Sequence, residues 1–492
     1  MKPAKLVLYT ATMIALGGIY GCSGGDDTTI TIDAPTFGGG TGGSGSISQN
    51  CPDWAAARPQ IDGVDVCQLP ATILVDRELT SDIIWFMESR VTVGNGNKEM
   101  SVVEGTLESG DLVVTPTLTI EPGTDLIGKT NEFASLVITR GAKIMANGTA
   151  EAPIIFSSDD DDDTGAGEWG GIILQGYAPI NLCTGAEQGN TACNVVSEGE
   201  SEFAGGYTPG DSSGEMEYVI INEGGYRFAE GNEINGLSLV AVGSGTVLDY
   251  IQINGNADDG IEFYGGTVNA KHLVLTGNQD DSLDWDEGWT GNIQYLLSIQ
   301  DELATGSSIE ADTRGTNDFA SLPTIANATF IGDGTYPSVF RFKDETGGFL
   351  LNVIADVKDG NTAVEYCVDV EDDGVTEENI NQGELVFNNV IVNCPTEFGV
   401  KPGVVENAGE DDLLSLANTT VTEADPQLDG NYQPLLGAAD GVAIAVPTFN
   451  GNFPASTADD AFLDDTDYIG ALEPGIDPNT LWYVGWTLPG TL

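Results

Sequence analysis

The chain has 492 residues, of which 77 are Asp or Glu and 16 are Lys or Arg, so its formal net charge is −61. A protein this acidic is repelled by nucleic-acid phosphates and by anionic lipid headgroups, which excludes a role in binding either polyanion. Hydrophobic residues still make up 40% of the chain, which is enough for a large folded core. The 65 glycines favour turns over long helices, so we expect a β-rich protein.

Residues 1–21 have the features of an export signal. Two lysines precede an apolar run, Leu6–Ile19, that is too short to span a bilayer. The segment Ile19–Cys22 (IYGC) resembles the bacterial lipobox, in which the cysteine becomes the lipidated first residue of the mature protein. Ser23 is similar to the residue that sorts such proteins to the outer membrane. We therefore expect an outer-membrane lipoprotein, on the periplasmic or the cell-surface face, whose only membrane attachment is the lipid on Cys22.

Residues 22–50 are mostly Gly, Ser, Thr and Asp with little to bury, and they predict a flexible tether. The six cysteines beyond Cys22 are Cys51, Cys67, Cys183, Cys193, Cys367 and Cys394. An even number in an exported chain indicates disulfides, and short loops favour pairing each cysteine with its neighbour in sequence. The first of these pairs would then pin an N-terminal cap over residues 51–70. Because no CxxC pair and only one histidine are present, a zinc site is disfavoured.

Repeats indicate the architecture of residues 71–430. Residues 251–263 align with residues 273–285 at a shift of 22, and Tyr295 continues that alignment in the next copy. Short alternating strands at such a period, separated by Gly, Asn and Asp turns, are typical of a coiled parallel sheet. We predict an all-β fold, a right-handed parallel β-helix. Its inward-facing side chains should include Leu273, Leu275, Leu283 and Trp285.

The two ends of the predicted coil also carry signals. Residues 118–123 recur 18 residues later as residues 136–141, which indicates that coiling has begun by this point. An open solenoid end would add strands from a neighbouring molecule, so natural solenoids cover their ends. We assign the aromatic-rich residues 431–492 to a C-terminal capping region.

Several segments resemble a family of exported β-helix lipoproteins of Gram-negative bacteria. They are Leu118–Thr124, Glu168–Gly171, Asn235–Leu237, Gly265–His272, Asp467–Ala471, Trp482 and Gly485–Thr487. The resemblance covers residues 65 to 490 and implies the β-helix fold and the exported location. That family has no settled biochemical activity, so the resemblance supplies no catalytic residues.

Carboxylates occupy the outward positions of the repeat. One predicted column consists of Glu262, Asp284, Glu310, Arg341 and Glu365, and the next of Asp286, Asp312 and Lys343. Like charges one rung apart, about 4.8 Å, repel by about 0.9 kcal/mol in water and by more where solvent is excluded. Solvent or cations must therefore separate them.

Calcium is the natural counterion for such columns, because it binds carboxylate and carbonyl oxygens. The candidate ligands share a place in two successive acidic turns or in the strands that follow them: Asp258, Asp259, Glu262, Asp280, Asp281, Asp284 and Asp286. A solvated acidic face without bound metal is the alternative.

Two functions of different class remain open. The favoured one is a non-catalytic surface protein whose β-helix binds a glycan or an outer-membrane protein partner. The other is a calcium-dependent polysaccharide lyase or glycoside hydrolase, with Asp258, Asp280, Asp281 and Arg341 as candidate catalytic residues. Polygalacturonase-like motifs match poorly, since the Gly-His-Gly element is absent and His272 is expected to be a surface residue equivalent in position to Gln294.

Overall fold

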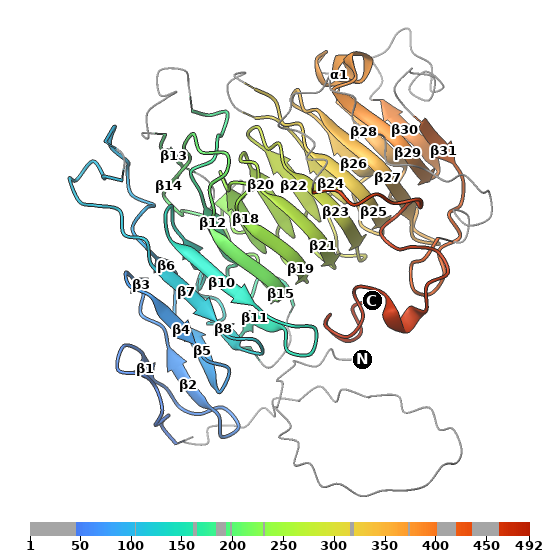
Figure 1. Cartoon of the computed structure of the whole chain (residues 1–492). Coiled ribbons are helices and arrows are strands. Elements are labelled where there is room, and N and C mark those ends of the chain that lie inside the picture. The colour runs from blue at the N-terminus through green and yellow to red at the C-terminus, as the bar shows by residue number, and fades with distance from the viewer. Residues whose placement is uncertain are drawn as a thin grey trace, which may run out of the picture.

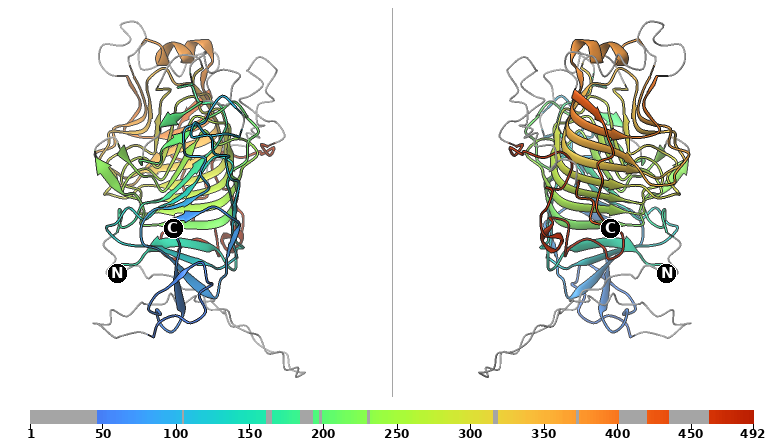
Figure 2. Two further views of the ribbon diagram at one scale, coloured as in Figure 1. Left: turned by 90° about the vertical axis from the view of Figure 1, so that its left-hand side faces the viewer. Right: turned by 90° about the vertical axis from the view of Figure 1, so that its right-hand side faces the viewer.

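The computed structural model describes residues 46–103, 105–160, 165–183, 193–196, 199–229, 232–314, 319–371, 374–400, 420–434 and 462–492. The predicted export signal, Cys22 and nearly all of the predicted tether lie outside these ranges. Long stacks of parallel strands dominate the described residues, and they confirm the predicted all-β parallel β-helix (Figure 1). Figure 2 shows the stack from two sides, with the N-terminal strands at one end and the helix α1 (Thr376–Gln382) at the other. No helix in the described ranges is long and apolar enough to cross a bilayer.

One side of the coil is a parallel sheet, which we call the first sheet. In spatial order its strands are β3 (Thr72–Ile73), β6 (Val91–Val93), β9 (Leu136–Ile138), β12 (Ile172–Gln175), β18 (Leu237–Val240), β20 (Ile261–Tyr264), β22 (Leu283–Asp286), β24 (Ile309–Ala311), β26 (Ser338–Phe342), β28 (Tyr366–Val370) and β30 (Thr396–Val400). Each strand lies one coil above the last.

The second sheet forms the rest of the coil. Its strands are β1 (Ala56–Ala57), β2 (Asp65–Gln68), β4 (Arg77–Leu79), β5 (Ile83–Met87), β7 (Thr117–Ile120), β8 (Asp125–Gly128), β10 (Lys143–Asn147), β11 (Ile154–Ser158), β15 (Gly214–Asn222), β19 (Val247–Asn254), β21 (Asn269–Thr276), β23 (Asn292–Ile299), β25 (Thr324–Gly332), β27 (Gly348–Val357), β29 (Leu385–Asn393) and β31 (Thr420–Glu423). Two small hairpins lie outside both sheets, β13 (Val195–Val196) with β14 (Phe203–Ala204) and β16 (Arg227–Ala229) with β17 (Asn232–Glu233). The described C-terminal residues also include a short 3-10 helix, Pro478–Thr480.

The second sheet has a corner, and β15 shows how it forms. The first half of β15 pairs with β10 and the second half pairs with β11, so two separate strands in the lower coils become one bent strand above them. In each bent strand a single residue has left-handed backbone geometry, with φ between 47° and 64°. From β15 to β29 these corner residues are Tyr218, Tyr250, His272, Tyr295, Asn327, Asn352 and Asn389. Asparagine tolerates this geometry, and the aromatic members stack on one another instead.

The interior of the coil is apolar, as the alternation predicted. Leu273, Leu275, Leu283 and Trp285 are completely buried and belong to one continuous core. The predicted register is correct between β19 and β21, where Ile251 lies beside Leu273. Burial of both sheets against one core gives the fold its main driving force.

Two register predictions are wrong. Leu273 lies beside Leu296 rather than Tyr295, because the coil from β21 to β23 is one residue longer than the one before it. His272 is therefore equivalent in position to Tyr295 rather than to Gln294. The recurrence of residues 118–123 at 136–141 is not a coil repeat, since β7 belongs to the second sheet and β9 to the first. Strands on both sides of the coil share the same alternation, so polarity alone cannot tell one side from the other.

Three disulfides join the cysteines in the pairs expected from sequence: Cys51–Cys67, Cys183–Cys193 and Cys367–Cys394. At the N-terminal end β1 runs antiparallel to β2, and Trp54 stacks on Trp85 with ring centroids 5.3 Å apart. This short hairpin covers the first coil.

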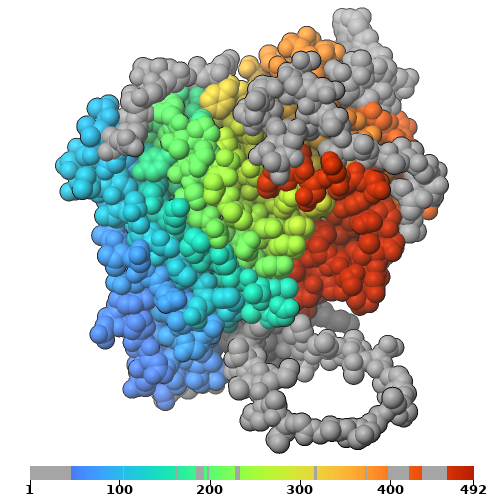
Figure 3. Space-filling view, in the orientation of Figure 1, coloured from blue at the N-terminus to red at the C-terminus, as the bar shows by residue number. Residues whose placement is uncertain are grey.

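Residues 462–492, called here the C-terminal segment, lie along the flank of the second sheet instead of across the end of the coil (Figure 3). Gln294 Nε2 donates to the Asp464 carbonyl at 2.9 Å, and Gln252 Nε2 donates to Thr491 Oγ1 at 2.9 Å. Trp486 meets the faces of corner residues edge-on and closes a cluster with outward apolar side chains of the sheet. Residues 435–461 of the predicted capping region lie outside the described ranges.

Candidate metal centre

The acidic turns lie between the second sheet and the first, immediately before β20 and β22. Two completely buried asparagines order these turns. The Asn256 N–H donates to Asn278 Oδ1 at 3.2 Å and joins one turn to the next, and Asn256 Nδ2 donates to the Asp259 carbonyl at 2.7 Å within its own turn. A Cβ atom at Gly260 would lie 2.5 Å from Asn278 Nδ2, so glycine is required for this close approach. The carboxylates of the two turns are therefore one rung apart.

Five of the seven predicted ligands form two overlapping groups. The inner triad is Asp259, Asp281 and Asp284, and the outer triad is Asp258, Asp259 and Asp280. Within each triad, one carboxylate oxygen from each residue lies within 4.8 Å of those from the other two. Calcium–oxygen bonds are about 2.3–2.6 Å long, so oxygens that share one ion can be up to about 5 Å apart. Each triad fits a common hard cation.

The inner triad is nearly closed to solvent. Asp259, Asp281 and Asp284 are each less than one-tenth exposed, and Asp284 Oδ1 has no hydrogen-bond partner. Burial, reinforced by neighbouring carboxylates, raises the pKa of all three groups well above the ordinary aspartate value. Without a cation these carboxylates are held in an environment that opposes their charge.

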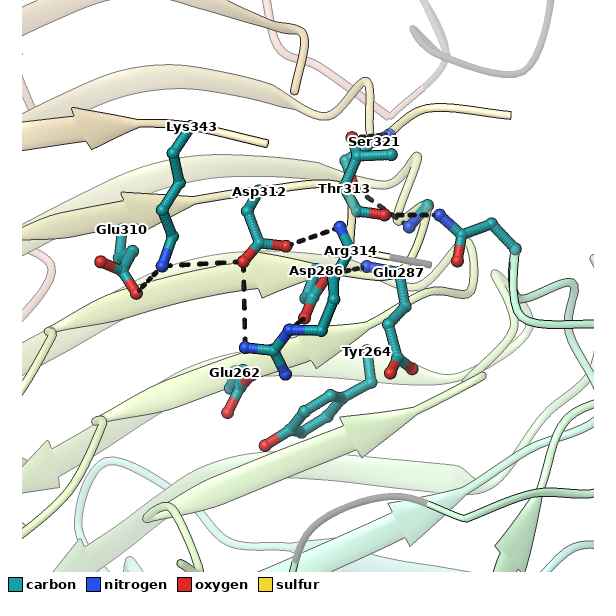
Figure 4. Close-up of polar contacts among 12 residues, drawn as sticks. Glu262, Tyr264, Asp286, Glu287, Glu310, Asp312, Thr313, Arg314, Ser321 and Lys343 are labelled. Carbon is teal, nitrogen blue, oxygen red and sulfur yellow. Dashed lines mark hydrogen bonds and ion pairs between the residues drawn. The ribbon is translucent and has the colours of Figure 1, made fainter. Parts of the chain in front are cut away.

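The remaining two predicted ligands lie outside both triads. Glu262 follows the turn in β20 and accepts a hydrogen bond from Asn235 Nδ2 at 2.5 Å. Asp286 ends β22 and forms a hydrogen bond with Asp312, while Arg314 Nε lies 3.2 Å from its other side (Figure 4). Burial and then Asp286 raise the pKa of Asp312 to about 9, so this pair shares a proton at neutral pH.

The outward column of the first sheet is confirmed for four of its five predicted members. Glu262, Asp284, Glu310 and Arg341 lie side by side in register across β20, β22, β24 and β26. The next member is Asp369 and not Glu365. The connection between β26 and β28 is longer than the alignment assumed, so Glu365 lies before β28. There its N–H donates to the Pro337 carbonyl.

The basic side chains along this column are bound to carboxylates. Arg341 Nη1 lies 2.5 Å from Asp369 and Nη2 lies 3.2 Å from Glu371, so Arg341 does not join the acidic turns as the catalytic alternative required. Lys343 Nζ donates to Glu310 at 2.7 Å (Figure 4). Burial alone would lower the pKa of Lys343, but Glu310 outweighs it and the net shift is upward.

His272 belongs to the corner of the second sheet and not to the acidic turns. Its Nδ1 lies 2.7 Å from Asp249 Oδ1, and its ring stacks between Tyr250 and Tyr295. Trp482 of the C-terminal segment covers it, so it is largely buried instead of being a surface residue.

Sequence reasoning missed Arg314 as a member of this region. Its side chain is 56% exposed, and it lies beside Asp286 and Asp312. Arg314 follows β24 in a connection that leaves the repeat, so no column of the alignment contained it. The only signal for Arg314 in the sequence was its place two residues after Asp312, an aspartate that the alignment did contain.

The fold and this carboxylate cluster define a parallel β-helix protein with a candidate cation site at the edge of its first sheet. The sequence model of the pectate-lyase-like β-helix domain family matches residues 104–427, more than half of the chain, and the chain belongs to this family. No curated protein and no solved structure matches the chain.

Proposed function

We propose that this protein is an exported, lipid-anchored β-helix that binds calcium in its acidic turns and presents the loaded site to a glycan or an outer-membrane protein, without catalysis. The observation that carries the proposal is the inner triad, in which three buried carboxylates converge and Asp284 Oδ1 lacks a partner. Calcium would satisfy that oxygen and would compensate the negative charges that the three carboxylates hold in a buried site.

Binding without catalysis is supported by the state of the candidate bases. A β-elimination needs an Arg or Lys close to a metal-bound uronate and able to accept a proton. In the described part of the column, Arg341 is held by Asp369, and Lys343 is held by Glu310 with its pKa raised. A base that is bound to a carboxylate and has a raised pKa accepts no proton from substrate.

Export and anchoring are supported by two separate features. The three disulfides belong to oxidising compartments outside the cytosol. The lipobox resemblance at Cys22 supplies the attachment, and the tether would place the β-helix away from the bilayer. Mass spectrometry of the mature N-terminus should find a diacylated Cys22, and Cys22→Ala should move the protein from the membrane to the soluble fraction. An unmodified mature N-terminus would contradict anchoring.

Calorimetry of the purified protein tests calcium binding. Calcium should raise the melting temperature and EDTA should reverse the gain, because a ligand bound only to the folded state stabilises it. Asp284→Asn should remove most of this gain, while Asp301→Asn, which changes a carboxylate outside both triads, should keep it. Equal melting temperatures in calcium and in EDTA would contradict the proposal.

A second candidate is a calcium-dependent polysaccharide lyase, and Arg314 is the observation that favours it. This side chain is more than half exposed and lies beside Asp286, which is two residues along β22 from Asp284 of the inner triad. A glycoside hydrolase is less well supported, since carboxylate oxygens of Asp258 and Asp280 lie within 4.8 Å of each other, closer than the separation of about 5–9.5 Å used by paired carboxylates in glycosidases.

A panel of acidic and neutral glycans separates the two candidates. The binding proposal predicts no new reducing ends and no unsaturated uronate absorbance, with or without calcium. Calcium-dependent product that disappears in Arg314→Gln, but persists in Arg77→Gln, would replace the non-catalytic proposal with the lyase.

A further inference from the structure

Asp259 belongs to both triads. We propose that the acidic turns hold two divalent cations bridged by the Asp259 carboxylate, one in the inner triad and one in the outer triad. This inference rests on the proposed calcium binding and adds the number of ions, their ligands and the order in which they load.

The inner position is indicated by an oxygen that lacks a protein partner. Asp284 is 8% exposed, and its Oδ1 is buried without a hydrogen bond. One oxygen of the Asp284 carboxylate lies within 4.8 Å of an oxygen of Asp259 and of Asp281. An unsatisfied buried carboxylate oxygen is costly, and a cation is the partner that the surrounding carboxylates would attract.

Charge balance favours two ions over one. The two triads contain five carboxylates, and a single divalent cation would leave three of their negative charges uncompensated. The nearby basic side chains are already paired, Lys343 with Glu310 at 2.7 Å and Arg227 with Glu233 at 3.1 Å. A second divalent cation would leave one negative charge, which solvent at the outer triad can screen.

Asp259 is suited to the bridging position. Its Oδ1 accepts the Asp281 N–H at 2.9 Å, which fixes the carboxylate between the two turns. A carboxylate has two oxygens and about four lone-pair sites, so this one hydrogen bond leaves capacity for two ions. The Asn256–Asn278 contact holds the turns in the register that this bridge needs.

The two positions differ in access to solvent, which predicts their order of loading. Every member of the inner triad is buried, whereas Asp280 of the outer triad is partly exposed. The inner ion should bind first and exchange slowly. The outer ion should bind more weakly, and it is the one that an anionic group of a ligand could reach.

Isothermal titration of the EDTA-treated protein with calcium alone, in buffer of physiological salt, tests the proposal. We expect two equivalents per chain, with one remaining in Asp280→Asn, one in Asp284→Asn and none in Asp259→Asn. The equivalent lost in Asp280→Asn should be the weaker. Asp301→Asn, a carboxylate in the next turn outside both triads, should keep two.

The possible failures have different meanings. One equivalent in the native protein that Asp280→Asn leaves intact would overturn the two-ion bridge and keep the proposed calcium binding. The absence of any saturable equivalent would overturn both. Circular dichroism should accompany each variant, and if Asp259→Asn does not fold, the stoichiometry of the partly exposed Asp280→Asn decides.

Discussion

Arg140 is a completely buried arginine that donates its hydrogen bonds to carbonyl oxygens and a side-chain amide oxygen instead of carboxylates. Its guanidinium donates to the carbonyls of Gly96 and Cys193, each at 2.7 Å, and of Gly205 at 3.1 Å. Burial lowers the pKa of Arg140 to about 10, so it stays charged at neutral pH. The side chain ties three connections together next to the Cys183–Cys193 disulfide.

Replacing Arg140 with Met should destabilise the protein by about 3 kcal/mol or more, because several buried carbonyls would lose their donor. Arg140→Lys should not restore stability, since an ammonium cannot reproduce the guanidinium fork. Urea unfolding measures the loss. The control is Lys143→Met on an exposed position of β10; a loss of equal size there would contradict this account.

Asp125 in β8 gives a pH dependence with a definite sign. Burial raises its pKa to about 7 in the folded protein, against about 3.9 in an unfolded chain. The folded state therefore holds a proton that the unfolded state releases between these values. Stability from this group is highest below about pH 4, falls as the pH rises, and levels off above about pH 7.

Asp125→Asn should therefore match the native protein near pH 4 and exceed it above pH 7, by at most about 4 kcal/mol, since one pKa unit corresponds to about 1.4 kcal/mol. Urea unfolding at both pH values provides the measurement, with Asp53→Asn on an exposed position as the control. If Asp125→Asn is no more stable than the native protein above pH 7, burial does not destabilise the charged form of Asp125.

Among the elements, the C-terminal segment and the corner of the second sheet depend on each other. Trp486 packs edge-on against Tyr218 and Tyr250, with ring centroids 5.8 and 6.0 Å away. Higher up, the Gly470 N–H donates to the Asn352 carbonyl at 2.9 Å. The aromatic corner residues Tyr218 and Tyr250 thus contact an apolar side chain of the segment, and the corner residue Asn352 contacts its main chain.

Trp486→Ala should release the end of this segment from β15 and β19, because a buried Trp truncated to Ala costs about 3–5 kcal/mol. Hydrogen exchange of residues 480–492 should accelerate while the calcium stoichiometry stays the same. Val484→Ala, at a position that is 40% exposed, should leave exchange unchanged. Undisturbed exchange in Trp486→Ala would mean that the hydrogen bonds alone hold the segment.

Some of these elements could be predicted from sequence and some could not. The strands around Leu273 and Leu283 were predictable, because adjacent coils there have equal length and bury the same alternating positions. The extra residue before Leu296 left polarity unchanged, so it gave no warning. At the corner, each strand bends at one residue with left-handed backbone geometry. A Tyr or His in the sequence does not indicate such a bend. Arg314 lies outside the repeat, and docking of residues 462–492 depends on tertiary contacts.

At the scale of the whole molecule, the net charge of −61 implies repulsion among carboxylates of the stacked coils. Carboxylates one rung apart are closer than the Debye length of about 10 Å at 0.1 M salt and farther apart than the length of about 3 Å at 1 M. The melting temperature should therefore rise with sodium chloride, by about 1 °C for each kcal/mol of repulsion that salt screens in a chain of this length. Differential scanning calorimetry in EDTA checks this, and a flat response would contradict it. Calcium at millimolar concentration should add a further rise that sodium chloride of equal ionic strength does not reproduce.

The path of the C-terminal segment bears on how the chain is completed during biosynthesis. Residues 462–492 are made well after the coils that contain Ile220 and Val274, yet they cover these two side chains. Until residues 462–492 have been made and have docked, those apolar side chains stay open to chaperones and proteases. A product cut short before residue 462 would keep its coils but carry this uncovered strip, which marks it as incomplete.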